Sequence, residues 1–433
     1  MGFEQALSGL SAASQNLDVI GNNIANASTN GFKEATAQFA DVYATSLWGA
    51  SSTQVGIGTQ VAAISAQFTQ GNITTTGNPL DVAVNGSGFF RESNNGVITY
   101  SRDGQFSLNA SGQVVNSKGV QLTGYQPDPN DPTGQKISSA PPTPLVLSLA
   151  PVAPQRTGNV SLSLNLDSTS KVINTNPAAP TNYVFSPTNS STYTSSTSMT
   201  VYDSLGNSHT MSYYFVDQGV QPPVAPATVG NTQWSVYVTG DNNLVLNAAA
   251  PGVLQFGPTG TLASGVSTTM TVPYTAAQLG NGANTMSVVT TFPVAQTSQY
   301  GVPFSVSSNS QDGYTTGQLA GFSISQTGVV SGRYTNGQTR VQGQIALANF
   351  INPQGLVAQG GNQFAESPAS GAPIVGAPGT GSLGTVQSGA LESSTVDLTT
   401  ELVNMITAQR IYQANAETVK TQDQVQQTLN NLR

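Results

Sequence analysis

His209 is the only histidine of the chain, and cysteine is absent. A Ser-His-Asp triad or a zinc site built on histidine would therefore have to use His209. It follows Asp203 in the segment 206–210, whose residue types indicate a turn that enters a strand. We interpret His209 as a structural or solvated residue. The lack of cysteine excludes disulfides, thiolate metal sites and cysteine nucleophiles.

One segment has the spacing of a phosphate-binding loop. Residues 379–384 read GTGSLG and match the pattern G-x-G-x-x-G. Such a loop needs a strand before it and a helix after it. We predict neither, because Pro378 adjoins the segment and residues 385–389 continue it as a turn-rich connector. Acidic residues are too sparse to identify a catalytic carboxylate pair. We therefore predict no enzyme, no catalytic residues, no cofactor and no metal site.

Charge is scarce in this sequence of 433 residues. Only 7% of the residues are Asp, Glu, Lys or Arg, against about 25% in an ordinary soluble domain. The net charge of −8 leaves no basic surface for phosphates, so we predict no nucleic-acid partner. With 37% hydrophobic residues, the chain should fold into several domains rather than remain disordered.

We expect neither a membrane-inserted segment nor a cleavable signal peptide. No apolar run approaches the roughly 20 residues that a spanning helix needs, and the first residues, MGFE, lack the basic start of a secretory signal. The 45 glycines and 24 prolines indicate many turns between short strands.

The two ends of the chain have a different pattern from its middle. Apolar residues recur at steps of three and four, which is the spacing of a coiled-coil seam and predicts a helix over about residues 3–26. At 1.5 Å per residue this helix would be roughly 36 Å long. The poor helix formers of residues 26–31 should end it. The seam consists of Phe3, Ala6, Leu10, Ala13, Leu17, Ile20 and Ile24.

The C-terminal segment repeats this design. Cap candidates at residues 393–397 precede a second apolar stripe, which predicts a long helix from about residue 398. Its members are Leu398, Leu402, Met405, Tyr412, Ala416 and Val419. Each helix could pack on the core of its own domain. We favour instead pairing of the two helices with each other, with the remaining apolar edges facing other subunits.

The middle of the chain reads as β structure. Two meanders, at 96–125 and 319–350, flank a Pro-rich crossing linker at 127–154 and an alternating, charge-poor region. We therefore predict a mostly β fold with α-helical termini that pair as coiled-coil helices, and discontinuous β domains between them. The predicted domains are a terminal helical domain (1–26 and 394–433), a connector (27–71 and 385–393), an inner β domain (72–148 and 297–384) and an inserted outer β domain (149–296).

Both termini carry long motifs of one family. Residues 17–33, LDVIGNNIANASTNGFK, resemble the N-terminal signature of bacterial flagellar rod and hook proteins, and residues 391–398 and 404–416 resemble their C-terminal signature. The N-terminal motif residues include Asn22, Asn23, Asn26, Gly31 and Phe32. Residues 77–90, GNPLDVAVNGSGFF, are similar to a segment shared by hook and distal rod. Residues 311–314 and 343–350 look like hook-protein segments.

The resemblance implies a structural subunit that polymerises into the flagellar hook, a curved tube that joins rod to filament and transmits torque as a universal joint. It also implies an extracellular location, reached through the flagellar type III export apparatus. The implied partners are further copies of the chain, the distal rod, the hook cap and the hook-filament junction proteins. The resemblance implies terminal helices that form an inner tube and β domains that form outer layers.

From the stripes we predict that ten residues mediate self-assembly, within and between subunits. They are Phe3, Leu10, Leu17, Ile20, Ile24, Leu398, Leu402, Met405, Tyr412 and Val419. Two alternatives remain open at this point. One is a distal rod subunit of the flagellum. The other is a secreted β-rich adhesin, whose binding face would use exposed aromatic residues such as Tyr193, Tyr213 and Trp234.

Overall fold

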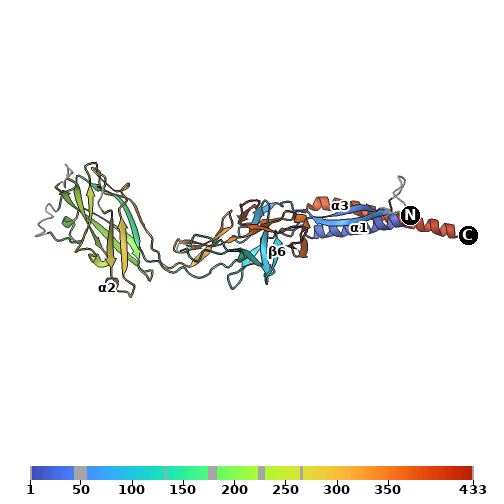
Figure 1. Ribbon diagram of the computed structural model, residues 1–433, viewed down its shortest axis with the longest axis horizontal. Helices are drawn as coiled ribbons and strands as arrows, with labels where there is room; N and C mark the ends of the chain where they lie inside the picture. Colours follow the sequence, from blue (N-terminus) through green and yellow to red (C-terminus); the bar gives the residue numbers. More distant parts are fainter. Residues whose placement is uncertain are drawn as a thin grey trace. The chain divides into compact units, whose positions relative to one another are not determined.

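The computed structural model describes residues 2–42, 56–131, 134–173, 183–222, 230–263 and 267–431. Its secondary structure is mostly β, with one long helix near each terminus, as the sequence predicts (Figure 1). The chain folds into two compact units. Unit 1 comprises residues 1–149, 320–333 and 339–433, and unit 2 comprises residues 150–319 and 334–338.

Unit 1 contains both long helices and most of the short strands. Its helical elements are α1 (Gly2–Ala25), α3 (Leu398–Asn431) and the 3-10 turn η3 (Pro353–Gly355). Its strands are β1 (Ala35–Val42), β2 (Gly58–Ala66), β3 (Ile73–Thr75), β4 (Val82–Asn85), β5 (Phe89–Asn94), β6 (Val97–Ser101), β7 (Phe106–Leu108), β8 (Val114–Asn116), β9 (Gln121–Tyr125), β10 (Thr143–Pro144), β20 (Leu319–Ile324), β21 (Val329–Tyr334), β22 (Thr339–Ile345), β23 (Leu347–Asn349), β24 (Val357–Gly360), β25 (Gln363–Ala365), β26 (Ile374–Gly376), β27 (Thr385–Ser388) and β28 (Ala390–Glu392).

Unit 2 is built from strands with one short helix. Its strands are β11 (Asn159–Asp167), β12 (Ser195–Tyr202), β13 (Ser208–Val220), β14 (Thr232–Thr239), β15 (Gly252–Phe256), β16 (Thr269–Tyr274), β17 (Met286–Thr291), β18 (Ser298–Tyr300) and β19 (Ser305–Gln311). The helical elements are α2 (Ala276–Leu279) and the 3-10 turns η1 (Ser190–Thr192) and η2 (Asp241–Asn243).

Helices α1 and α3 lie side by side (Figure 1) and run antiparallel. The direction follows from two contacts: Asn23 bonds to Glu401 near one end of the pair, and Gly9 lies against Asn415 further along. Asp397 caps α3, because its carboxylate accepts hydrogen bonds from the first free backbone amides of the helix. The hairpin β1–β2 packs on α1.

The main sheet of unit 1 runs in the order β20-β21-β22-β9-β5-β6-β25-β24, with short strands paired at its sides. Its core includes Phe90 and Phe106, whose rings meet edge to face at 5.2 Å. Part of the Pro-rich segment that the sequence indicates as a crossing linker packs on this core. Leu145 and Leu147 are each only 1% exposed, so residues near 145 belong to the β domain.

Unit 2 packs two sheets on one core. One sheet has the order β16-β17-β11-β18, with β19 paired to β11, and the other has the order β12-β13-β14-β15. Apolar side chains of both sheets form a single cluster, which is the arrangement of a β-sandwich. Tyr213 and Trp234 lie in this cluster with no exposed surface, and Tyr193 is half-buried. The prediction that Tyr213 and Trp234 are exposed residues of an adhesin's binding face is therefore wrong.

The G-x-G-x-x-G segment joins two strands. Strand β26 ends at Gly376 and β27 begins at Thr385, so the expectation that no strand precedes the segment is wrong. A strand rather than a helix follows it, and the helix N-terminus that would bind a phosphate is missing from this part of the described chain. Across the described residues, no helix combines the length and apolar character needed to cross a membrane.

Candidate assembly surface

The apolar stripe of α1 lies on the buried side of the helix, apart from Phe3. Ile20 is buried, Leu10, Leu17 and Ile24 are half-buried, and Phe3 is 40% exposed. The other buried side chains of α1 are mostly small, and they face α3 or the hairpin. Two of them, Ala6 and Ala13, belong to the predicted stripe, and the others are Ala12, Val19 and Asn23.

The stripe of α3 is more exposed. Leu398, Leu402 and Tyr412 are 47%, 41% and 37% exposed, while Met405 and Val419 are half-buried. Four further apolar residues of α3 are about half-exposed or more: Val403, Ile406, Ile411 and Val425. The predicted stripe slips by about one position toward the C-terminus and includes Val425. Sequence reasoning missed Val403, Ile406 and Ile411, because they fall outside that stripe. Their signal in the sequence is that the helix carries more apolar residues than one stripe can hold.

Small residues form the contact between the two helices. Ala408 of α3 is 2% exposed, and a Cβ built on Gly9 would lie 2.9 Å from Nδ2 of Asn415. A cavity of about 260 Å³ lies beside this contact, lined by Gly9, Ala12, Ala13, Asn16, Phe39, Thr59, Ala408, Ile411 and Asn415. The chain therefore brings the helix backbones close together without covering the larger apolar side chains.

Asn23 fixes the helix pair to the hairpin. Its side-chain amide donates to the carbonyl of Ala35 at 2.8 Å and accepts from the amide of Ala35 at 3.1 Å. The same amide group donates to Oε1 of Glu401 at 3.4 Å. Because Asn23 and Glu401 are almost fully buried, these bonds satisfy polar groups that water does not reach.

The remaining motif residues build the turn that ends α1. Asn26 donates to Oδ1 of Asn22 at 2.8 Å and accepts from the hydroxyl of Thr29 at 3.2 Å. Gly31 has a φ of +69°, and a Cβ there would lie 2.5 Å from the backbone nitrogen of Asp103. The position therefore requires glycine, both for its left-handed backbone and for its close approach to the β domain.

Three charged side chains meet where the two ends of the chain enter the β domain. Lys33 Nζ lies 2.6 Å from Oε1 of Glu392, and Arg102 Nη1 lies 3.2 Å from Oε2 of the same carboxylate. Lys33 and Glu392 have no exposed side-chain surface, and Arg102 has 4%. The amide of Gly71 also donates to Glu392 Oε1, at 2.7 Å. Burial lowers the pKa of both cations, and the carboxylate opposes this effect.

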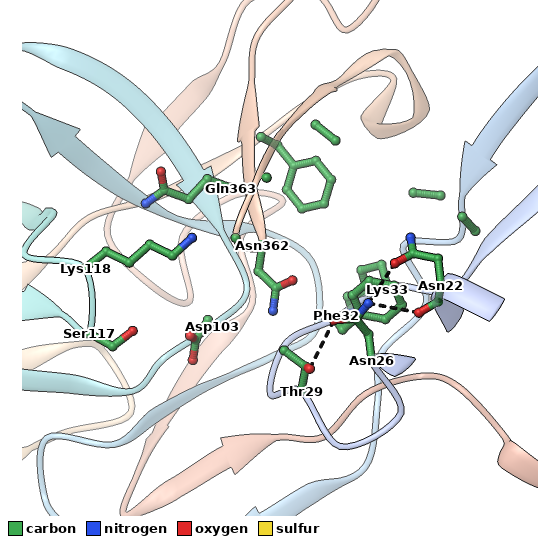
Figure 2. Close-up of a pocket in the computed structure, with 16 residues that line it drawn as sticks. Asn22, Asn26, Thr29, Phe32, Lys33, Asp103, Ser117, Lys118, Asn362 and Gln363 are labelled. Atoms are coloured by element: carbon green, nitrogen blue, oxygen red, sulfur yellow. Dashed lines mark hydrogen bonds between the residues drawn. The ribbon is translucent and has the colours of Figure 1, made fainter. Parts of the chain in front are cut away.

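We call Lys33, Arg102 and Glu392 the junction cluster. Sequence reasoning missed it, although Lys33 and Glu392 both lie inside the terminal motifs. A pocket of about 440 Å³ lies next to the cluster, between the turn after α1 and the segments 117–118 and 358–364. Figure 2 shows the side chains of Lys118 and Asn362 pointing into this space. Asn362 donates to the carbonyl of Asn30 at 2.8 Å, which ties the turn to the β domain.

His209 lies in unit 2 and holds two loops together. Its Nδ1 is 2.5 Å from Oδ2 of Asp241, and its Nε2 is 3.2 Å from Oδ2 of Asp203. Burial alone would lower the pKa of His209, but the bonds to the two carboxylates outweigh it and raise the pKa. Asn281 and Tyr274 donate to the same carboxylates. Both ring nitrogens are occupied, so the arrangement is structural.

Four family models match segments that together span most of the chain. They are the flagella basal body rod protein (residues 3–33), the flagellar hook protein FlgE/F/G D1 domain (83–170), the flagellar basal body protein FlaE D2 domain (165–314) and the flagellar basal body rod FlgEFG protein C-terminal region (387–432). The N- and C-terminal matches coincide with α1 and α3.

Full-length relatives of the chain are also flagellar proteins. The chain is 42% identical to the flagellar hook protein FlgE of Salmonella typhimurium and to that of Escherichia coli, with 100% of each chain covered. It is 32% identical to FlgE of Treponema pallidum, covering 99% of this chain and 98% of the relative. The crystal structure of Helicobacter pylori flagellar hook protein FlgE2 shares the fold, with a TM-score of 0.51 at 17% identity, over 74% of this chain and 100% of that one.

Proposed function

The chain belongs to the family of bacterial flagellar hook proteins, and we propose that its two terminal helices carry the contacts through which it polymerises. It is a structural subunit of the flagellar hook. The full-length match to hook proteins favours this function over a distal rod subunit and over a secreted adhesin.

The observation that carries the proposal is the set of large apolar side chains that the chain leaves uncovered on α1 and α3. Phe3, Leu402 and Ile406 are each at least 40% exposed. Burying one such side chain completely stabilises a contact by about 1.5–3 kcal/mol. Several of them on one helix pair provide enough driving force for association of copies, and contiguous exposed apolar surface is typical of interaction sites.

We assign the ten stripe residues to this interface in two groups. Ile20, with the half-buried Leu10, Leu17, Ile24, Met405 and Val419, supports the helix pair within one chain. Phe3, Leu398, Leu402 and Tyr412 face other copies. The proposed domains are helices at 1–26 and 394–433, a connector at 27–71 and 385–393, an inner β domain at 72–148 and 297–384, and an outer β domain at 149–296. We move one boundary of this division: residues 297–319 belong with the outer β domain, because β18 and β19 pair with β11 in unit 2.

The family supports a wider setting for the subunit. We propose export through the flagellar type III apparatus to the outside of the cell. There the hook would contact the distal rod at one end and the hook cap, then the hook-filament junction proteins, at the other. In this setting the chain has a mechanical role and transmits torque without an enzymatic step.

The test is a double substitution, Leu402→Glu with Ile406→Glu, in the full-length chain. Because both side chains are exposed in the single chain, the variant should keep its far-UV circular dichroism and lose polymer formation, measured by sedimentation and electron microscopy. Val220→Glu is the matched control: Val220 is 70% exposed in unit 2, and its variant should polymerise. Normal polymers from the double variant would refute the proposal.

A further inference from the structure

We propose that Asp18 of α1 forms an ion pair with Arg410 of α3 in a second copy of the chain, and that this pair fixes how neighbouring helix pairs align. The inference rests on the proposed function, because it concerns the same polymer interface. It adds a specific charged contact to the apolar contacts proposed for that interface.

Both side chains point away from the contact between α1 and α3 within one chain. At 100° per residue, Asp18 lies about 160° around α1 from the buried Ile20, and Arg410 lies about 160° around α3 from the buried Ala408. Asp18 and Arg410 are exposed. The two charges therefore cannot meet inside a chain whose helices pack through Ile20 and Ala408, whereas a second copy can bring them together.

The exposed apolar neighbours of Arg410 indicate that its side of α3 is a contact surface. Val403 lies seven residues before Arg410 and Ile406 lies four before, which places all three on one side of α3. Val403 is 59% and Ile406 is 49% exposed. If this side is covered in the polymer, the guanidinium of Arg410 is covered with it. A covered guanidinium needs a carboxylate partner, since an unpaired buried charge is strongly destabilising.

The carboxylates of α3 are engaged elsewhere, except for one oxygen of the buried Glu401, which lies about 180° around the helix from Arg410 and faces away from it. Asp397 caps the helix, Glu417 pairs with Lys420 at 3.3 Å, and Asp423 accepts from Gln427 at 3.0 Å. Helix α1 supplies the complementary charge: within Gly2–Ala25 it carries Glu4 and Asp18 and neither Lys nor Arg.

Asp18 is the better partner of the two. Leu7 of α1 is 46% exposed, and Asp18 lies only about 20° from it around the helix. The Asp18 carboxylate and an apolar side chain therefore lie on one line along α1. On α3, Arg410 and Val403 likewise place a charged and an apolar side chain on one side of the helix. Glu4 lies in the first turn of α1, where the helix N-terminus already stabilises its charge.

A charge exchange in the full-length chain tests the pair. Asp18→Arg and Arg410→Asp should each raise the critical concentration for polymerisation at least about tenfold, and the combined D18R/R410D variant should restore it to within about threefold of wild type. Circular dichroism should be unchanged throughout. The matched control is Glu4→Arg combined with Arg410→Asp, which should not restore assembly.

Cross-linking gives a second readout that does not depend on rescue. The chain has no cysteine, so D18C and R410C subunits can be mixed, copolymerised above the raised critical concentration of both variants, and treated with a short bis-maleimide once polymers are seen. We expect covalent dimers of one D18C and one R410C chain, and none when E4C replaces D18C. Three results would overturn the inference. The R410D variant could assemble like the wild type, the combined E4R/R410D variant could restore assembly, or the mixed polymers could yield no D18C–R410C dimers. None of these outcomes affects the Leu402 and Ile406 test of the proposed function.

Discussion

At the scale of single residues, His209 is a charged link between two loops of unit 2. A neutral imidazole donates through one nitrogen, whereas both nitrogens of His209 face carboxylate oxygens. The protonated ring satisfies both contacts. Burial alone would raise the pKa of Asp203, but hydrogen bonds from Asn207 and His209 outweigh it and lower the pKa. Burial is likewise outweighed at Asp241, where the backbone amide of Thr210 and the ring of His209 lower the pKa.

The stability of unit 2 should therefore depend on pH in a defined direction. The raised pKa of His209 means that its stabilisation is complete below the unfolded pKa of about 6.5 and is lost as pH rises through the folded pKa. The aspartates contribute above about pH 3.9 and lose their contribution as pH falls through their lowered pKa values. His209→Gln should cost about 1–3 kcal/mol at pH 5.5 and less at pH 9.

The measurement is urea denaturation followed by fluorescence of Trp234, which is fully buried in unit 2. A Trp48→Phe background makes Trp234 the only tryptophan, because the sequence has two. The wild type should lose stability between pH 5.5 and pH 9, and the glutamine variant should lose less. An equal difference between the two proteins at both pH values would contradict the role assigned to His209.

At the scale of elements, the junction cluster joins parts of the chain that are far apart in sequence. Glu392 ends β28 and contacts Lys33, 359 residues away, and Arg102, 290 residues away. The backbone reinforces this contact, since Gly31 donates to the carbonyl of Glu392 at 2.8 Å. The cluster thus connects the helix pair, through both of its chain ends, to the β domain of unit 1.

Removing the shared carboxylate should weaken unit 1 strongly. Glu392→Gln leaves Lys33 and Arg102 buried without their counter-charge, which costs about 3–5 kcal/mol. Urea denaturation followed by circular dichroism at 222 nm measures this loss of stability, because α1 and α3 supply most of the helical signal. The control is Glu417→Gln: Glu417 is 69% exposed and its loss should cost less than about 1 kcal/mol. Similar losses in both variants would disprove a stabilising cluster.

The sequence predicted the two long helices but not the contacts that hold them in place. Steps of three and four predicted α1 and α3 because both helices bury one side. The contacts across the helix pair were not predictable, because Gly9 and Ala408 are too small to stand out in a hydrophobic pattern. The junction cluster escaped for another reason: a lone Lys or Glu in a motif carries no information about a partner that lies hundreds of residues away.

At the scale of the whole molecule, the chain folds two β units and leaves its helix pair incompletely covered. Composition and alternation predicted the β class, and the terminal motifs predicted the family. Which strand faces are buried was harder to predict. Strand β14 has buried residues on both faces, so alternation alone does not distinguish Trp234 as core from Trp234 as a binding residue.

The uncovered helix surface and the membership in a hook family have one common explanation, namely that copies of the chain complete each other's helical packing. The β units then need no catalytic or ligand-binding residues to serve the assembly. In the proposed assembly, the β units surround the polymerised helices.

The most direct test of this account is electron microscopy of polymers grown from the full-length chain, at a resolution that shows side chains. We predict that α1 and α3 of each copy pack against the helices of other copies, with Leu402 and Ile406 buried between them. A polymer in which copies touch only through their β units, with Leu402 and Ile406 facing solvent, would contradict it.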